Sequence, residues 1–552
     1  MKAGLTSCLL TLSVSLVLAV PSSAQSLLHN EFRGLSRPSV LPKVTPCGPV
    51  FLTDSVSQNI ISGNSIACSD SGTGFTYENH YSRPFDLPGL GISGFVDVCE
   101  VDVAVEGAIS IAGTQVVTVY LYSTPAGTFP SGPLTQIGTA MVTVPDQSLT
   151  FVTVPITGTV PSGSELVVDV ASEDGVVNGS AFLIGSNNLG QTAPSYLTAP
   201  DCGIATPTDL ADVPPGYPNM QIVINALGTE YLAAVNPLHV DERSGGVASS
   251  NTNGVFEPGE TVWVDPSWTN PTAGTLTFST TATNFTGLAG PAYVVVDGTA
   301  AYGAIAPAGT SDCFDATGDC FALQVTGTRP AQHWDATFDE VESSLSTPST
   351  PGSVVKTWKL HIGESFPDVP TSQQFYKFIE NLFHNGVTGG CGGGNYCPDG
   401  STTRAQMAVF LLKAKLGSSY TPPACTGTVF LDVPCTGGIF DPWIEDLAGR
   451  GITGGCGGGN YCPGNSVTRA QMAVFLLKSK LGSSYVPPAA VGIFGDVPPT
   501  GTFAPWIEDL YNRQITGGCQ ASPLLYCPGN PNTRGQMAVF LVKTFGLLLY
   551  GP

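Results

Sequence analysis

The C-terminal third of the chain repeats one pattern of apolar and polar positions three times, between Phe366 and Leu547. In the first copy Met407, Phe410 and Leu411 are spaced i, i+3 and i+4, and the same spacing returns in the other two copies. This spacing predicts an amphipathic helix with one apolar stripe. A shorter striped helix is predicted before it in each copy. Two such helices cannot bury their apolar faces alone, so we expect the three copies to share one core as an all-α, pseudo-three-fold module.

A pair of polar residues marks the start of each longer helix. A threonine stands where an N-cap belongs and a glutamine follows three positions later, which is the arrangement of a capping box. The three pairs are Thr403 with Gln406, Thr468 with Gln471, and Thr533 with Gln536. We therefore expect each longer helix to begin directly after its threonine.

Before the repeats the pattern changes to short alternating runs, which predict β-strands. Between residues 47 and 228 the runs are Phe95–Val105, Val116–Tyr122, Phe151–Val154, Leu166–Val170 and Met220–Asn225. They predict an antiparallel β-sandwich over residues 47–228, which resembles the jelly-roll modules of secreted bacterial proteins. A second, immunoglobulin-like sandwich is predicted over residues 229–363. Its runs are Thr261–Val264, Thr275–Phe278, Ala292–Val296 and Thr357–His361.

Short motifs recur in a fixed order within the repeats. They are Phe-x-Asp-Val at Phe366–Val369, Trp-Ile-Glu-Asp-Leu at Trp443–Leu447, Ile-Thr-Gly-Gly at Ile452–Gly455 and Thr-Arg-Ala-Gln at Thr403–Gln406, with counterparts in the other copies. This order resembles the S-layer homology domain, which typically occurs in three tandem copies. The resemblance implies a helical module that anchors secreted bacterial proteins non-covalently to cell-wall polysaccharide. The copies span residues 364–424, 425–489 and 490–547.

The resemblance also implies which residues bind the polymer. In the family, the Asp of the first motif, the Trp of the first helix and the Arg after the N-cap threonine contribute to grooves that hold the polymer. The matching residues are Asp368, Asp432 and Asp496; Trp443 and Trp506; and Arg404, Arg469 and Arg534. A guanidinium at a helix N-terminus suits a carboxylate or phosphate. The structural alternative is that each Arg pairs with a nearby Asp and fixes the entry to the helix. The sequence departs from the family where Phe378 replaces Trp, Gly535 replaces Ala and Gln replaces Glu after Thr-Arg-Ala.

Charge and the N-terminal segment indicate where the protein acts. The chain has 42 acidic and 20 basic residues and a formal net charge of −22, so a broad attraction to nucleic acid or to an anionic membrane is not expected. Residues 1–24 read as a secretory signal, with an apolar run from Leu9 to Val20, and residues 25–46 as a linker. No later apolar run reaches the ~20 residues that a membrane span needs. We therefore expect an exported protein at the cell surface.

All but one of the 15 cysteines follow the signal, and an even number in an exported chain favours disulfides. Short spacing predicts the pairs Cys313–Cys320, Cys391–Cys397, Cys425–Cys435, Cys456–Cys462 and Cys519–Cys527. The pairs that remain are Cys47–Cys68 and Cys99–Cys202. The alternative to disulfides is that the cysteines bind zinc. Zinc sites need pairs of thiolates two to four residues apart, or histidines at similar spacing, and the loops have neither.

The start of the second sandwich contains a possible calcium loop. Counting from Ser249, the residues Asn251, Asn253 and Glu260 fall at positions three, five and twelve, which supply oxygen ligands in EF-hand loops. The first position is Ser instead of Asp, and Pro258 argues against a flanking helix. The structural alternative is a turn held by the Asn side chains.

Nothing in the sequence forms a recognisable catalytic motif, so we predict that the protein is not an enzyme and needs no cofactor beyond the calcium considered above. None of the histidines lies at metal-ligand spacing from another, so core or solvent-facing roles are expected for His29, His80, His239, His333, His361 and His384. The acidic pairs Glu445-Asp446 and Glu508-Asp509 are expected on a solvated helix face.

These features predict an envelope protein whose repeats bind a cell-wall polysaccharide or a peptidoglycan-linked polymer and whose two sandwiches are displayed. The alternative is an adhesin or a glycan-binding accessory protein, in which the first sandwich binds external carbohydrate. The segment Phe75–Tyr81 is rich in aromatic residues that suit sugar stacking, and rings that fill the core are its structural alternative. A third interpretation is a coat subunit that self-assembles. The sequence leaves the oligomeric state open.

Overall fold

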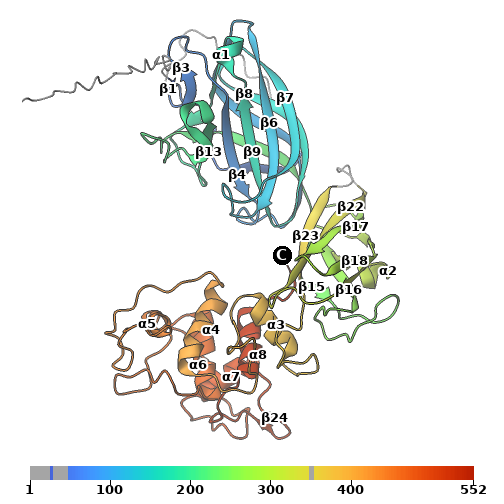
Figure 1. The fold of residues 1–552 in the computed structure, drawn as a ribbon, viewed down its shortest axis with the longest axis vertical. Coiled ribbons are helices and arrows are strands. Elements are labelled where there is room, and N and C mark those ends of the chain that lie inside the picture. Colours follow the sequence, from blue (N-terminus) through green and yellow to red (C-terminus); the bar gives the residue numbers. More distant parts are fainter. Residues whose placement is uncertain (1–24, 29–47, 347–352, 552) are drawn as a thin grey trace, which may run out of the picture. The chain divides into compact units, whose positions relative to one another are not determined.

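The computed structural model describes residues 25–28, 48–346 and 353–551. The predicted signal peptide, the predicted linker beyond residue 28, and Cys47 lie outside these ranges. The chain divides into two compact units, one mostly before residue 231 and one mostly after it, and each is described by itself (Figure 1).

The first unit is built from antiparallel strands. One sheet has the strand order β13-β12-β4-β9-β6-β7. Its members are β4 (Asn79–Asp86), β6 (Thr114–Pro125), β7 (Thr135–Pro145), β9 (Ser164–Ser172), β12 (Tyr196–Ala199) and β13 (Ile204–Asp209). The other strands are β1 (Gln25–Leu28), β2 (Val50–Thr53), β3 (Ala67–Asp70), β5 (Gly94–Ser110), β8 (Gln147–Val160), β10 (Ser180–Ile184), β11 (Ser186–Asn187), β14 (Gln221–Ile222) and the first part of β15 (Ile224–Val240). Among these, β5 pairs with β8 and β10, β15 with β2, and β1 with β3.

Strands of both groups contribute to one hydrophobic core. Along β6, the side chains of Val117, Val119 and Leu121 are buried and the residues between them are partly exposed, as period-two alternation requires. Val101 of β5 and Phe182 of β10 belong to the same core. The runs that predicted strands before residue 228 fall in β5, β6, β8, β9, β14 and β15, so these strand predictions are confirmed.

The aromatic segment Phe75–Tyr81, which runs into the start of β4, contributes two rings to this core. Tyr81 is fully buried, and its hydroxyl donates a hydrogen bond to the carbonyl oxygen of Ile66 at 2.9 Å. Tyr77 packs against the core from a partly buried position. For these two rings the structural alternative to sugar stacking is confirmed.

The disulfide of the first unit differs from the pairing predicted from spacing. Cys68 is joined to Cys202, which links β3 to the short 3₁₀ helix η1 (Pro200–Cys202). The predictions Cys47–Cys68 and Cys99–Cys202 are therefore wrong. Cys99 is disulfide-bonded as well. The Cys68–Cys202 bridge spans 134 residues, and such a separation follows from the folded arrangement of the chain, which spacing does not report.

The second unit begins with another β region. One sheet has the strand order β19-β17-β22-β23, and the second part of β15 pairs with β16, which in turn pairs with β20 and β21. The strands are β16 (Thr261–Thr269), β17 (Leu276–Gly287), β18 (Ala292–Asp297), β19 (Thr299–Ile305), β20 (Thr310–Asp312), β21 (Phe321–Thr326), β22 (Asp335–Leu345) and β23 (Val354–His361). The runs that predicted strands here fall in β16, β17, β18 and β23, so these predictions are also confirmed.

The repeats form helices in the second unit. The shorter helices are α3 (Tyr376–His384), α5 (Asp441–Gly449) and α7 (Ala504–Asn512), and the longer ones are α4 (Arg404–Leu416), α6 (Arg469–Leu481) and α8 (Arg534–Phe545). Each longer helix begins directly after its N-cap threonine, and each capping box makes both of its hydrogen bonds. The predicted helix starts are confirmed.

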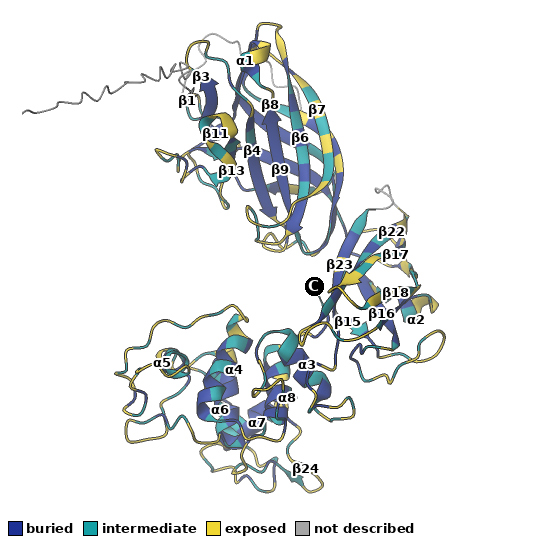
Figure 2. Cartoon of the chain, in the orientation of Figure 1, coloured by how far each residue is buried: buried dark blue, intermediate teal, exposed yellow. Residues whose placement is uncertain are grey.

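The three copies share their core. Helices α4, α6 and α8 contact one another, and Met407, Met472 and Met537, one from each helix, are fully buried. Figure 2 shows buried residues along these three helices. Each shorter helix packs beside the longer helix of another copy: α5 beside α4, α7 beside α6, and α3 beside α8. A copy on its own would therefore expose apolar surface that its neighbours cover.

The β region and the repeats of the second unit are in direct contact. The hydroxyl of Tyr550 accepts a hydrogen bond from the backbone N–H of Phe256 at 2.7 Å and donates one to the carbonyl oxygen of His361 at 3.1 Å. Lys377 of α3 forms an ion pair with Glu242 at 2.8 Å.

In the described part of the chain, every helix is too short or too polar to span a lipid bilayer.

Candidate functional site

The three motif aspartates hold the loops between the helices of their own copies. Asp432 accepts hydrogen bonds from the backbone N–H groups of Tyr461 and Cys462, both at 2.7 Å. The equivalent pairs, all at 2.7–2.8 Å, are Asp368 with Tyr396 and Cys397, and Asp496 with Tyr526 and Cys527. Because a carboxylate that accepts two backbone N–H bonds fixes the loop around it, these aspartates have a structural role.

Each motif arginine reaches across to another copy. Arg404 is only 4% exposed, and its Nε donates a hydrogen bond to the carbonyl oxygen of Tyr461 at 2.7 Å. Its guanidinium lies 4.6 Å from the centre of the Tyr461 ring, which is cation–π distance. The hydroxyl of Tyr461 in turn donates to the carbonyl oxygen of Arg404 at 2.8 Å. Copy one is thus joined to copy two by reciprocal contacts.

The same contacts recur between the other copies. Arg469 bonds to Tyr526 and Arg534 bonds to Tyr396, with Nε to oxygen distances of 2.8 and 2.7 Å. The contacts lead from copy one to two, from two to three, and from three back to one. This closed ring supports the structural alternative for the arginines, although the direct partner is a loop tyrosine instead of an aspartate.

These buried guanidinium groups keep unused hydrogen-bonding capacity. Among the described residues, the arginines that form ion pairs are Arg83, Arg243, Arg450 and Arg513, and the three motif arginines are not among them. The Nη2 atoms of Arg404 and Arg469 are buried and have no hydrogen-bond partner in that part of the chain. Burial lowers the pKa of both guanidinium groups. An acceptor from a ligand would offset the cost of leaving these donors unpaired.

The two tryptophans lie in a second kind of site, at the junction of neighbouring copies. Trp443 of α5 is half-buried and its ring meets that of Tyr420 edge to face, with 6.1 Å between ring centres. The Tyr420 hydroxyl donates to Asp446 at 2.8 Å and accepts from Arg450 Nη2 at 2.7 Å. Asp446 and Arg450 also pair directly at 3.0 Å. Aromatic rings, hydroxyl, carboxylate and guanidinium therefore converge at one partly exposed place.

The next junction repeats this arrangement. Trp506 meets Tyr485 edge to face at 6.2 Å, and Tyr485 bonds to Asp509 at 2.8 Å and to Arg513 at 3.0 Å. We name the two sets the Trp clusters. They are Trp443, Tyr420, Asp446 and Arg450, and Trp506, Tyr485, Asp509 and Arg513. Sequence reasoning missed Tyr420, Arg450, Tyr485 and Arg513, although the repeated segment Gly-Ser-Ser-Tyr before each tyrosine was a usable signal.

The third junction is built differently. Phe378 stands in place of Trp, and Asn381 and Asn385 donate their side-chain amides to the carbonyl oxygens of Leu547 and Leu548, at 3.0 and 2.9 Å. The Trp cluster therefore occurs at two of the three junctions.

The predicted polymer-binding residues fall into two groups. Arg404 begins α4, whereas Tyr420 and Trp443 meet just beyond its last residue, Leu416. A helix of 13 residues is about 20 Å long, so the arginine and the tryptophan at this junction lie at opposite ends of it. Arg404 and Asp432 both bond to the backbone of Tyr461, at its carbonyl oxygen and at its N–H group, whereas Trp443 lies near the other end of α4.

The expectation of a solvated acidic face is wrong for the glutamates of α5 and α7. Glu508 is buried and accepts backbone N–H bonds from Val491, Gly492 and Ile493 at 2.6–2.9 Å. Glu445 accepts bonds from the N–H groups of Thr426 and Gly427 at 2.6 and 2.8 Å. Both carboxylates hold the backbone of the loop that precedes their helix, and adjacent positions on the helix gave no indication of this.

Disulfides close the loops of the repeats. They join Cys391 to Cys397, Cys456 to Cys462, and Cys519 to Cys527, and two further short bridges join Cys425 to Cys435 and Cys313 to Cys320. These are the five pairs that short spacing predicts.

The predicted calcium loop forms a turn with a carboxylate cluster beside it. Asn251 and Asn253 each accept a backbone N–H two residues ahead with their side-chain oxygens, at 3.0 and 2.8 Å, as in the turn alternative. Carboxylate oxygens of Glu260, Asp241 and Glu257 lie within 4.8 Å of one another. Burial, together with the hydrogen bond to Glu257 and the charges of Glu257 and Asp241, raises the pKa of Glu260 to about 8.

Three of the six histidines lie close together in the structure, although they are not at metal-ligand spacing in the sequence. His333, His361 and His384 converge on Asp335 in the second unit. The sequence gave no indication, because the three histidines are contributed by a loop, a strand end and a helix end.

Comparison with known families finds a match in the first two repeats. The S-layer homology domain family matches residues 365–408 and 440–473. The chain thus carries S-layer homology domains in its C-terminal third, and such domains attach proteins to the cell wall at the cell surface. The disulfides are consistent with an exported protein. A comparison with curated proteins found no match.

Solved structures with partial likeness are glycosidases. One is a GH2 β-galacturonidase from Eisenbergiella tayi bound to galacturonate, 9% identical over 54% of this chain and 41% of its own, with a TM-score of 0.13. Another is the exo-β-D-glucosaminidase CsxA, 13% identical over 52% of this chain and 25% of its own, with a TM-score of 0.15. This chain spans less than half the length of either protein. At such scores the likeness carries no argument about activity.

Proposed function

We propose that the three repeats form one pseudo-three-fold module that holds the protein non-covalently on a cell-wall polysaccharide or peptidoglycan-linked polymer. The two β regions, as two sandwiches, are displayed from this anchor, and no catalytic activity is part of the proposal. The S-layer homology match supports the anchoring role.

The Trp clusters are the observation that carries the proposed binding site. A half-buried Trp ring offers an apolar face to a sugar ring, and the neighbouring Tyr, Asp and Arg offer hydrogen bonds to its hydroxyl or acidic groups. Arg450 and Arg513 have side chains that are 34% and 36% exposed, so a ligand reaches them without unfolding the module.

The motif arginines form a second proposed contact. Arg404, Arg469 and Arg534, with Asp368, Asp432 and Asp496 behind the loop tyrosines, line the other end of the longer helices. The unpaired Nη2 donors of Arg404 and Arg469 suit a carboxylate or phosphate of the polymer. In this arrangement the arginines both join the copies and bind an acidic group.

Cell fractionation with matched arginine variants tests the proposal. The protein should fractionate with the envelope and be released by chaotropes without detergent. Replacing Arg450 and Arg513 with Gln removes one charge-assisted contact per cluster, about 1.5–3 kcal/mol each, and should weaken envelope binding about 10–100-fold per site. The control is Arg243→Gln, because Arg243 is 33% exposed and lies in the β region. Equal binding by the double variant and the control would refute the Trp clusters as the site.

A further inference from the structure

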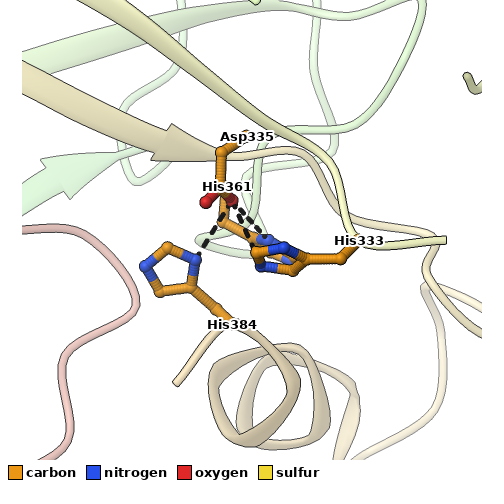
Figure 3. Close-up of side chains that lie close together, drawn as sticks. All are labelled: His333, Asp335, His361 and His384. Atoms are coloured by element: carbon orange, nitrogen blue, oxygen red, sulfur yellow. Dashed lines mark hydrogen bonds and ion pairs between the residues drawn. The ribbon is translucent and has the colours of Figure 1, made fainter. Parts of the chain in front are cut away.

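Three histidines and one aspartate, from three segments of the sequence, converge where the β region of the second unit meets α3 (Figure 3). His333 precedes β22 and Asp335 is its first residue. His361 is the last residue of β23 and lies directly opposite Asp335 in the antiparallel pair. His384 is the last residue of α3. One potential ligand atom from each residue lies within 4.8 Å of the others.

Two of the distances from Asp335 to the histidines are at the long end of the hydrogen-bond range, and the third is longer. Oδ1 of Asp335 lies 3.1 Å from His384 Nδ1, 3.2 Å from His361 Nδ1 and 3.5 Å from His333 Nε2. The His80–Asp169 pair elsewhere in the chain is closer, at 2.7 Å. Ligands at 2.0–2.1 Å from a tetrahedral zinc ion are about 3.3–3.4 Å from one another. The three distances from Asp335 are close to this value, and all four ligand atoms lie within 4.8 Å of one another.

A neighbouring carboxylate fixes the orientation of the most buried histidine. His361 Nε2 lies 2.8 Å from Oε2 of Glu380, and both side chains are fully buried. Nε2 faces Glu380 and Nδ1 faces Asp335, so the tautomer with its proton on Nε2 offers the lone pair of Nδ1 to an ion beside Asp335. Metal-binding histidines are usually held by such a carboxylate. The side chain of His333 is 46% exposed, which gives an ion a path to the group.

We propose that His333, Asp335, His361 and His384 bind one zinc ion that joins the β region to the first repeat. Three nitrogen ligands and one carboxylate oxygen suit zinc, whereas calcium requires oxygen ligands. Four protein ligands complete a tetrahedral site, so the ion has a structural role and leaves no open position for catalysis. The cysteines of the described residues are disulfide-bonded and do not compete. This proposal is independent of the proposed wall binding.

Zinc titration of the full chain tests the proposal. The protein is prepared without an oligohistidine tag, stripped with EDTA, and titrated with zinc by calorimetry and elemental analysis. We expect one zinc ion per chain and a higher melting temperature with zinc. His333→Asn and His384→Asn should lose this uptake, and Glu380→Gln should lower the affinity about 10–100-fold. The control is His239→Asn, because His239 pairs with Glu242 outside the group and its removal should leave uptake unchanged.

Two outcomes overturn the proposal. The first is that the native chain takes up no zinc. A melting temperature that changes with pH, as the histidines gain protons, but not with zinc belongs to this outcome. The second is uptake that is unchanged in both His333→Asn and His384→Asn. The melting temperature of each variant in EDTA separates a folding defect from the loss of a ligand. Because the His333 side chain is more exposed than that of His384, the His333→Asn variant is the less prone of the two to a folding defect.

Discussion

Replacement of Arg469 by Met tests whether the motif arginines join the copies. Met keeps an unbranched apolar side chain and removes the guanidinium. The variant loses the hydrogen bond from Nε to the carbonyl oxygen of Tyr526 and the stacking at 4.8 Å on the Tyr526 ring. The first contributes about 1.5–3 kcal/mol and the second about 0.5–2 kcal/mol. Removal of the unpaired, buried Nη2 donor offsets about 1 kcal/mol. The net loss of stability lies between about 1 and 4 kcal/mol, and the middle of this range, about 2–3 kcal/mol, is the value expected.

Hydrogen exchange of the intact protein measures this loss locally. Peptides that cover the Tyr526 loop and α8 should exchange about 30–100-fold faster in Arg469→Met, because each 1.4 kcal/mol corresponds to a factor of ten. Arg513→Met is the matched control in copy three, since Arg513 forms a partly exposed ion pair with Asp509 and its loss should cost less than about 1 kcal/mol. Exchange in Arg469→Met that is no faster than in the control would refute the role of the arginines in joining the copies.

Three further predictions concern stability. Glu508→Gln should destabilise the module by about 1–3 kcal/mol in urea unfolding, because it weakens three backbone N–H bonds; a variant as stable as the native protein would contradict this. The pKa of Glu260 is about 8 in the folded state and lower in the unfolded state, so the folded state binds more protons and stability should fall as pH rises from about 4.5 to 8. Calorimetry should show that the stability of Glu260→Gln falls less over this pH range than that of the native protein. If calcium raises the melting temperature of the native protein but not of this variant, the result supports the calcium loop over the turn. Removal of the Cys391–Cys397 bridge by a double Ser substitution should cost about 2 kcal/mol in thermal unfolding, and an unchanged melting temperature would show that the bridge does not stabilise the loop.

Features that depend on neighbouring residues in the sequence could be predicted. The threonine and glutamine of each capping box are three residues apart, and the apolar stripes repeat within one or two helical turns. The strands follow from alternation over a few residues. In each case the residues that decide the structure lie within one element, so the sequence pattern reports the structure directly.

Features that join distant segments could not be predicted. The Cys68–Cys202 bridge and the convergence of His333, His361 and His384 depend on how strands and helices pack. The family resemblance pointed to Arg404, but its contact with Tyr461 of another copy depends on the shared core. Glu508 and Asp509 are adjacent on one helix and both are buried, and their different partners depend on the path of the preceding loop for Glu508 and on Tyr485 and Arg513 for Asp509.

Equilibrium binding of the full chain to purified cell-wall polysaccharide tests the central claim most directly. The account predicts saturable binding in a co-sedimentation assay, weakened by salt, and strongly reduced when Arg450 and Arg513 are replaced with Gln. Arg243→Gln should bind as the native chain does, and all three proteins should melt within a few degrees of one another. The account is contradicted if the native chain does not bind any wall polymer fraction, or if the double variant binds as tightly as the native chain.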